Sequence, residues 1–245
     1  MLASLLAVLP GIAGATDVPA YTLDPVHTRV MFEIGHAGFS KALGTVSGST
    51  GVLLFDPDDW TAARLDVRVP LTRLDLGDTK WNVAALARNL LDGERFPEAR
   101  FVSTAVWPLD ETRAQVCGQL SLRGMTRPLC LDVVFNALQR HPLPPFRRTA
   151  GFSATGVMSR SDFGIDAWPT VIGDAVQLRI EAEAVRADRA VAEGLGTPAP
   201  LPEPPEPPST PEAETGLLFE DELPETEPYP PAPAPPEPGA AAIGP

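Results

Sequence analysis

The sequence predicts an all-β protein: an antiparallel barrel of about eight strands with one short helix, followed by a disordered C-terminal tail. Three observations lead to this prediction. Between residues 21 and 186, apolar and polar residues alternate in one run after another, which is typical of strands with one buried face. Gly, Pro and Asp separate these runs, and most connections are too short for the helices that join parallel strands. After residue 186 the composition changes abruptly.

Eight runs of alternating residues follow one another along the chain. Most are rich in the β-branched and aromatic residues that strands favour. The runs are 30–34, 44–55, 65–69, 101–107, 116–122, 129–135, 152–158 and 176–182. Closing eight such strands into a barrel leaves no exposed sheet edge, so we expect a closed barrel.

One segment breaks the alternation. From Asp78 to Leu91 the apolar residues follow helical spacing, with Asp78 near the start and Gly93 as a stop signal. We expect an amphipathic helix at one end of the barrel. It either plugs that end as part of the core or covers it as a lid, and the pattern leaves both open.

The two ends of the chain differ from its body. An apolar run from Leu2 to Ile12 is followed by small residues, which is typical of a secretory signal peptide, although no Lys or Arg precedes it. Residues 187–245 hold 17 of the 29 prolines and 12 of the 32 acidic residues, against one basic residue. Such a stretch buries too little apolar surface to fold. We therefore expect a signal peptide (1–15), a β domain (21–186), a disordered tail (187–245) and a periplasmic or secreted protein.

The charge is also divided unevenly. The formal charge of −13 splits into about −2 for residues 1–186 and about −11 for the tail. Neither part offers the basic face that a nucleic acid requires, so we exclude nucleic-acid binding. The tail could recruit a transient membrane or protein partner. The oligomeric state stays open, a dimer included.

The residues that could carry chemistry are few. Cys117 and Cys130 lie on consecutive predicted strands, on the face opposite the apolar residues, and are either bonded or free thiols. Their spacing does not indicate a metal site. Of the three histidines, His141 lies in a Pro-rich loop that we interpret as solvated, which leaves His27 and His36. No nucleophile, metal or phosphate-binding motif is found, so we expect no catalytic residue and no enzyme.

Five segments in order carry a resemblance to a known family. They are Leu23–His27, His36–Ser40, Phe96–Phe101, Gly118–Pro128 and Arg160–Gly164, which read LDPVH, HAGFS, FPEARF, GQLSLRGMTRP and RSDFG. Together they resemble the YceI-like family of polyisoprenoid-binding proteins over residues 21 to 185. Each motif alone is weak, but five in the same order make a chance match improbable.

The resemblance implies a lipocalin-like barrel, often periplasmic, with a long internal tunnel. Its ligand would be an isoprenoid chain, such as an isoprenoid quinone tail or a polyprenyl phosphate, held for carriage or storage, and no catalytic cofactor is expected. This sequence departs from the family in its acidic tail. It also departs at Asn89–Asp92, which replaces the paired phenylalanines common after the helix and bears on the width of the tunnel.

Small inward residues alternate with aromatic ones, which would leave a channel lined by rings. The residues that we expect to line this cavity are Phe32, Ile34, Phe39, Phe55, Val67, Trp81, Leu90, Phe101, Leu120, Phe135, Phe152, Met158, Phe163 and Leu178. Candidates for a ligand head group at the barrel mouth are His27, His36, Arg160 and Asp162.

Three alternatives remain at this point. Arg160 and Asp162 could instead tie a turn through an ion pair. The cavity could serve a small hydrolase or isomerase with His27 or His36 as its base. The barrel could also be a solid core whose tail acts as an interaction module.

Overall fold

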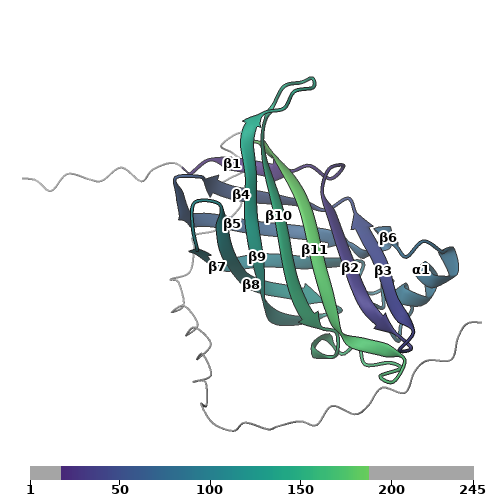
Figure 1. Ribbon diagram of the computed structural model, residues 1–245. Helices are drawn as coiled ribbons and strands as arrows, with labels where there is room; N and C mark the ends of the chain where they lie inside the picture. Colours follow the sequence, from purple (N-terminus) through teal and green to yellow (C-terminus); the bar gives the residue numbers. More distant parts are fainter. Residues whose placement is uncertain (1–17, 188–245) are drawn as a thin grey trace, which may run out of the picture. The chain divides into compact units, whose positions relative to one another are not determined.

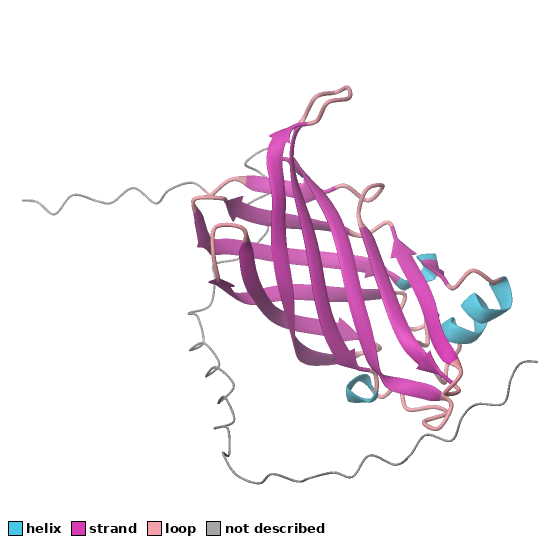
Figure 2. Ribbon diagram, viewed as in Figure 1, coloured by secondary structure: helices cyan, strands magenta, loops and turns pink. Residues whose placement is uncertain are grey.

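A computed structural model describes residues 18–187, which form one antiparallel β-barrel (Figure 1). Strands make up most of this region, and helices contribute only short pieces at one end (Figure 2). The predicted signal peptide, and all but the first residue of the predicted tail, lie outside the described residues.

The strands are short near the N-terminus and long near the C-terminus. Their bounds are β1 (Ala20–Leu23), β2 (Arg29–His36), β3 (Ser40–Ser47), β4 (Thr50–Asp56), β5 (Asp59–Pro70), β6 (Leu74–Asp75), β7 (Glu98–Pro108), β8 (Arg113–Leu122), β9 (Met125–Arg140), β10 (Arg148–Ser159) and β11 (Ile172–Arg186). The helices are α1 (Thr79–Leu86) and the 3₁₀ turns η1 (Leu71–Arg73) and η2 (Ser161–Phe163).

Eight of these strands close into a ring. The order is β1, β4, β5, β7, β8, β9, β10 and β11, and β11 pairs back onto β1, with Tyr21 opposite Arg186. Along its earlier part β11 pairs with β2 instead, where Leu178 lies opposite Phe32. All these pairings are antiparallel, so the predicted eight-stranded barrel is confirmed.

Strands β1 to β4 form one long, interrupted hairpin. β2 pairs with β3 and β1 pairs with β4, so the break between β1 and β2 lies beside the break at Gly48 and Ser49. Gly48 has a φ of 80°, and a Cβ there would lie 2.8 Å from the Arg73 side chain. Only glycine adopts this conformation without strain, which fixes the bend at this point.

The helix is shorter than the sequence predicts. Asp78 begins it as expected, since its carboxylate accepts hydrogen bonds from the amides of Lys80 and Trp81. The prediction that it continues to Leu91 is wrong, because Ala87 leaves helical geometry with a ψ of 159°. The chain then folds back, and the amide of Gly93 donates to the carbonyl of Leu86. No helix within residues 18–187 has the length and apolar character needed to cross a membrane.

The two cysteines are joined by a disulfide. Cys117 on β8 lies directly opposite Cys130 on β9. Their neighbours Val116 and Leu131 line the interior, so the bond crosses the outer surface of the barrel.

A cluster of aromatic rings lies in the barrel interior at the end away from α1. There Phe55, Trp60, Phe135 and Phe152 form an aromatic cluster with ring centroids 5.1 to 5.9 Å apart. Several pairs meet edge to face, which is a favoured arrangement. This cluster closes one end of the interior and leaves the remainder to a cavity.

Candidate ligand-binding cavity

A cavity of about 520 Å³ occupies the barrel between the aromatic cluster and α1. This volume falls in the range of small-molecule sites. The lining comes from all the long strands and from α1, and it consists almost entirely of apolar side chains. The interior is therefore a partly empty apolar chamber and not a solid core.

The opening of the cavity lies at the α1 end. Trp81 on α1, and Trp168 and Val171 in the loop before β11, line the chamber and yet are 43 to 51% exposed to solvent. The amide of Ala37 in the β2–β3 turn donates to the carbonyl of Val171, so these segments adjoin one another. Because no residue of α1 is fully buried, the helix covers the mouth and does not plug it.

Eleven of the fourteen predicted lining residues contact the cavity. They are Phe32, Ile34, Phe55, Val67, Trp81, Leu90, Phe101, Leu120, Phe152, Met158 and Leu178. Period-two alternation found those on strands because one face of each strand points inward.

The other three do not line it. Phe39 lies at the tip of the β2–β3 turn and is 92% exposed, because Ala37 and Gly38 reverse the chain there with positive φ. Phe135 lies in the aromatic cluster, beyond the end of the chamber. Phe163 is buried in a second core cluster with Leu71 and other residues near η2. Their placement as cavity-lining residues is therefore wrong.

Few polar side chains reach the cavity. Within the described residues its lining contains no carboxylate, lysine, tyrosine or cysteine. The polar residues of the lining are Thr28, His36, Ser49, Arg64, Ser103 and Arg160. Among the described lining residues, none is a carboxylate that would orient His36 as a general base.

Arg160 is the most deeply buried charged residue of the lining, with 4% of its surface exposed. Its guanidinium donates to the carbonyl oxygens of Gly173 and Ile172 at 2.8 and 2.9 Å, and to that of Ile165. These bonds join the η2 loop to the start of β11. Asp162 is exposed and forms no ion pair with Arg160, so the predicted pair is wrong. The backbone carbonyls take the role that was expected of Asp162.

His36 and Arg160 are the two predicted head-group residues that line the cavity, both on its α1 side. The His36 ring lies 5.2 Å from the ring of Trp81, at the mouth. Asp162 does not contact the chamber.

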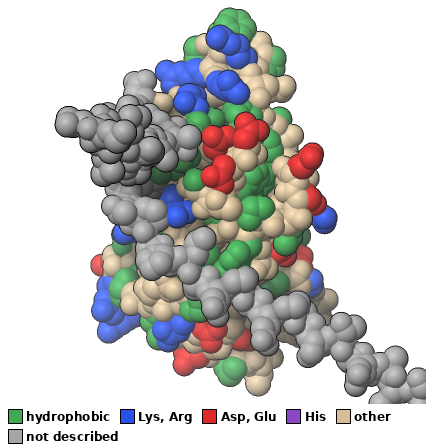
Figure 3. Space-filling view, turned by 90° about the vertical axis from the view of Figure 1, so that its left-hand side faces the viewer, with side chains coloured by type: hydrophobic (Ala, Val, Ile, Leu, Met, Phe, Trp, Pro, Cys, Tyr) green, Lys and Arg blue, Asp and Glu red, His purple; other side chains and the backbone are tan. Residues whose placement is uncertain are grey.

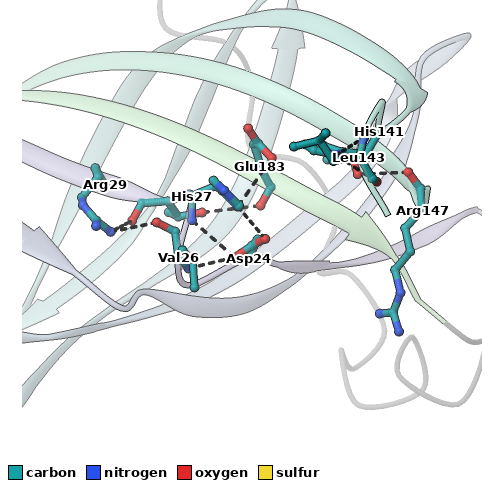
Figure 4. A network of polar contacts seen from close by, with 10 residues as sticks. Asp24, Val26, His27, Arg29, His141, Leu143, Arg147 and Glu183 are labelled. Carbon is teal, nitrogen blue, oxygen red and sulfur yellow. Dashed lines mark hydrogen bonds and ion pairs between the residues drawn. The ribbon is translucent and has the colours of Figure 1, made fainter. Parts of the chain in front are cut away.

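His27 does not line the cavity, so its placement at the mouth is wrong. It occupies the turn between β1 and β2, where its Nδ1 lies 2.8 Å from Asp24 Oδ2 and 4.0 Å from Glu183 Oε2 (Figure 4). The hydrogen bond to Asp24, with the negative charges of Asp24 and Glu183, raises the pKa of His27. Asp24, His27 and Glu183 are close enough to share a cation. The Asp24–His27 hydrogen bond already accounts for their arrangement.

Sequence reasoning missed two buried serine hydroxyl groups. Ser103 accepts a hydrogen bond from the amide of Leu65 at 2.8 Å, where a bulge interrupts the pairing of β7 with β8. Ser49 is fully buried at the β3–β4 break, and its hydroxyl finds no partner among the described residues. Neither position shows a sequence signal, because a serine in a strand or bend is ordinary.

Comparison with known proteins places this geometry in a family. The family model of the YceI-like domain matches residues 21–184. The UPF0312 protein of Pseudomonas savastanoi pv. phaseolicola is 32% identical over 176 residues, which cover 71% of this chain and 90% of the relative.

Solved structures share the fold. Burkholderia cenocepacia BcnA superposes with a TM-score of 0.59 at 19% identity, covering 66% of this chain and 98% of BcnA. A polyisoprenoid binding domain from Saccharophagus degradans superposes with a TM-score of 0.51 at 11% identity, covering 69% and 99% of the two chains. The matched family model spans the closed barrel and its cavity, and the chain belongs to the YceI-like family.

Proposed function

We propose that this protein binds a long apolar lipid of the isoprenoid class in its barrel and holds it for carriage or storage. The observation that carries the proposal is the chamber of about 520 Å³ with an apolar lining that lacks carboxylates in the described residues. An empty apolar space of this size is costly to keep unless a ligand fills it. The likeness in fold to the polyisoprenoid binding domain from Saccharophagus degradans supports an isoprenoid chain as the guest.

The energetics favour a branched hydrocarbon. Burial of one five-carbon isoprene unit contributes roughly 2 to 4 kcal/mol before ordering costs are subtracted. A few units suffice for tight binding, because each 1.4 kcal/mol changes the dissociation constant about tenfold. Affinity would then come from the chain and not from the head group.

A polar head would lie near the mouth. His36 offers an imidazole there, and Arg160 offers the guanidinium donors that its three carbonyl partners leave free. A quinone carbonyl or a prenyl phosphate would accept hydrogen bonds from such groups. The function that we propose is therefore binding without catalysis, which the almost wholly apolar lining supports.

We also propose that the chain is exported and acts in the periplasm or outside the cell. The disulfide between Cys117 and Cys130 supports this placement, since such bonds persist in oxidising compartments. Fractionation of the source cells, with the chain detected in the periplasmic extract or medium, would test it. Confinement to the cytoplasm would contradict it.

The central test is the lipid that the protein carries. The full chain is purified from its native host without detergent, and the extracted lipid is identified by mass spectrometry. We expect about one polyprenyl lipid per barrel. Absence of lipid, together with no uptake of an added polyprenyl quinone, would contradict the proposal.

A variant pair sharpens this test. Ala85 on α1 lines the chamber at its mouth, whereas Val83 on the same helix is 66% exposed and does not. Ala85→Trp fills part of the entrance and should reduce uptake about tenfold, whereas Val83→Trp should leave it unchanged. Equal uptake by the two variants would show that the lipid binds elsewhere.

A further inference from the structure

The hairpin between β9 and β10 projects beyond the barrel, at the end opposite α1 (Figure 1). The strands stay paired up to Arg140 and Arg148. Beyond them the amide of His141 donates to the carbonyl of Arg147 at 2.8 Å, and that of Phe146 to the carbonyl of Leu143 at 3.0 Å. The tip is therefore a bonded turn that extends away from the cavity mouth.

Positive charge gathers at the base of this tip. Arg140, Arg147 and Arg148 are exposed, and Arg140 lies directly opposite Arg148 across the strands. Like charges in that position destabilise a strand pair. Within residues 18–187 none of the three forms an ion pair. The near-neutral charge of residues 1–186 conceals this local cluster, which would accommodate an anionic partner.

Apolar side chains occupy the tip itself. Leu143 and Phe146 are 63% and 52% exposed. Phe146 has a φ of 55°, a conformation that a bulky residue seldom adopts. The space-filling view shows hydrophobic and basic side chains together at this projecting end (Figure 3). A strained, exposed aromatic residue beside arginines that form no ion pair within residues 18–187 indicates a contact surface.

We propose that this hairpin docks on a bilayer that contains anionic phospholipids. Arg140, Arg147 and Arg148 would meet lipid phosphates, and Leu143 and Phe146 would enter the interface between head groups and acyl chains. Protein segments that combine basic and apolar side chains bind to anionic membrane surfaces. A nucleic acid would use the arginines, but it would not require an exposed Leu and Phe at the tip. The inference does not depend on what the barrel carries.

The test is cosedimentation of the full chain with vesicles of phosphatidylcholine, alone or with about one third phosphatidylglycerol, at low salt. We expect binding to the anionic vesicles only. The double variant R147Q/R148Q should weaken it about tenfold or more, since each basic residue near such a surface changes affinity roughly fivefold. Its matched control, R88Q/R127Q, removes two charges elsewhere on the barrel and should bind like the parent.

A second pair separates a bilayer from other anions. L143S/F146S should also weaken binding about tenfold, whereas V157S, at an exposed apolar residue of the barrel wall, should not. Circular dichroism verifies that each variant folds, and the ends of the chain are identical in all of them. Three results would overturn the proposal: no binding to anionic vesicles, equal loss in R88Q/R127Q, or full binding by L143S/F146S. The last would show that charge alone holds the chain on the vesicles and that the tip does not enter the bilayer.

Discussion

At the residue scale, Arg160 shows why a motif can be found in a sequence without its role being visible. The sequence suggested a partner two residues away, but the guanidinium donates to three backbone carbonyls, one in the η2 loop and two at the start of β11. The Arg160 side chain thus holds the η2 loop against β11 where no strand pairing does so. Its burial beside the cavity gives it a structural role whether or not a ligand also uses it.

Arg160→Leu should therefore destabilise the fold. It leaves buried carbonyls without donors, and each such group costs about 1 to 3 kcal/mol. We expect the free energy of unfolding to fall by about 3 kcal/mol, and by less for Arg160→Lys, which keeps one donor group. Urea denaturation followed by circular dichroism measures both. An unchanged midpoint in the Leu variant would refute the structural role.

His27 makes a pH-dependent contribution at the corner between β1 and β2. Its pKa is raised from 6.5, so its stabilising effect is complete below pH 6.5 and is lost as the pH rises through the folded-state pKa. Burial alone would raise the pKa of Asp24. Hydrogen bonds from His27 and from backbone amides outweigh this effect and lower the pKa from 3.8. That carboxylate stabilises the fold above pH 3.8, and its effect is lost in stronger acid. The pair contributes most between these values.

The His27→Gln variant should lose this dependence. We would measure urea midpoints at about pH 5.5 and pH 8. We expect the midpoint of the parent to exceed that of the variant by more at the lower pH. The difference will be small, because the side chain is 53% exposed and water screens the interaction. If the difference in urea midpoint between parent and variant is the same at both pH values, the interaction of His27 with Asp24 is not the cause of that difference.

At the element scale, most strands were predictable and the breaks were not. Alternation identifies which residues face inward, so β2, β5, β7 to β11 and most of the eleven confirmed lining residues follow from it, whereas β1 and β6 were missed and β3 and β4 were taken as one run. The interruption at Gly48 and the shift at Ser103 depend on neighbours far along the chain. The early end of α1 has the same cause, since the segment that folds back at Gly93 satisfies its last carbonyls. Phe39 shows the limit of alternation, because a tight turn and not a strand sets its direction.

The disulfide links β8 and β9, which backbone hydrogen bonds already join. Its cysteines are 13 residues apart, and closing a loop of about this length in the unfolded chain contributes roughly 2 to 3 kcal/mol. The double variant Cys117→Ser/Cys130→Ser should unfold at correspondingly lower urea concentration. Because the bond lies on the outer surface, lipid uptake should persist in the folded variant. If the variant lost lipid uptake but kept its stability, the disulfide would act on the cavity and not on the stability of the fold.

At the scale of the whole molecule, a chamber closed at one end by aromatic rings and open beside α1 should limit ligand length. Binding to the folded state alone stabilises it by about 2.7 kcal/mol at a ligand concentration one hundred times the dissociation constant. For a barrel of this size that raises the midpoint of thermal unfolding by roughly 5 to 10 °C. Across prenyl quinones of increasing chain length at fixed concentration, the shift should grow with each added unit and then reach a plateau when the chamber is full. Ala85→Trp should lower the plateau, and Val83→Trp should not. A shift that depends on the quinone ring but not on chain length would place the binding energy at the head group and contradict a chamber built for the chain.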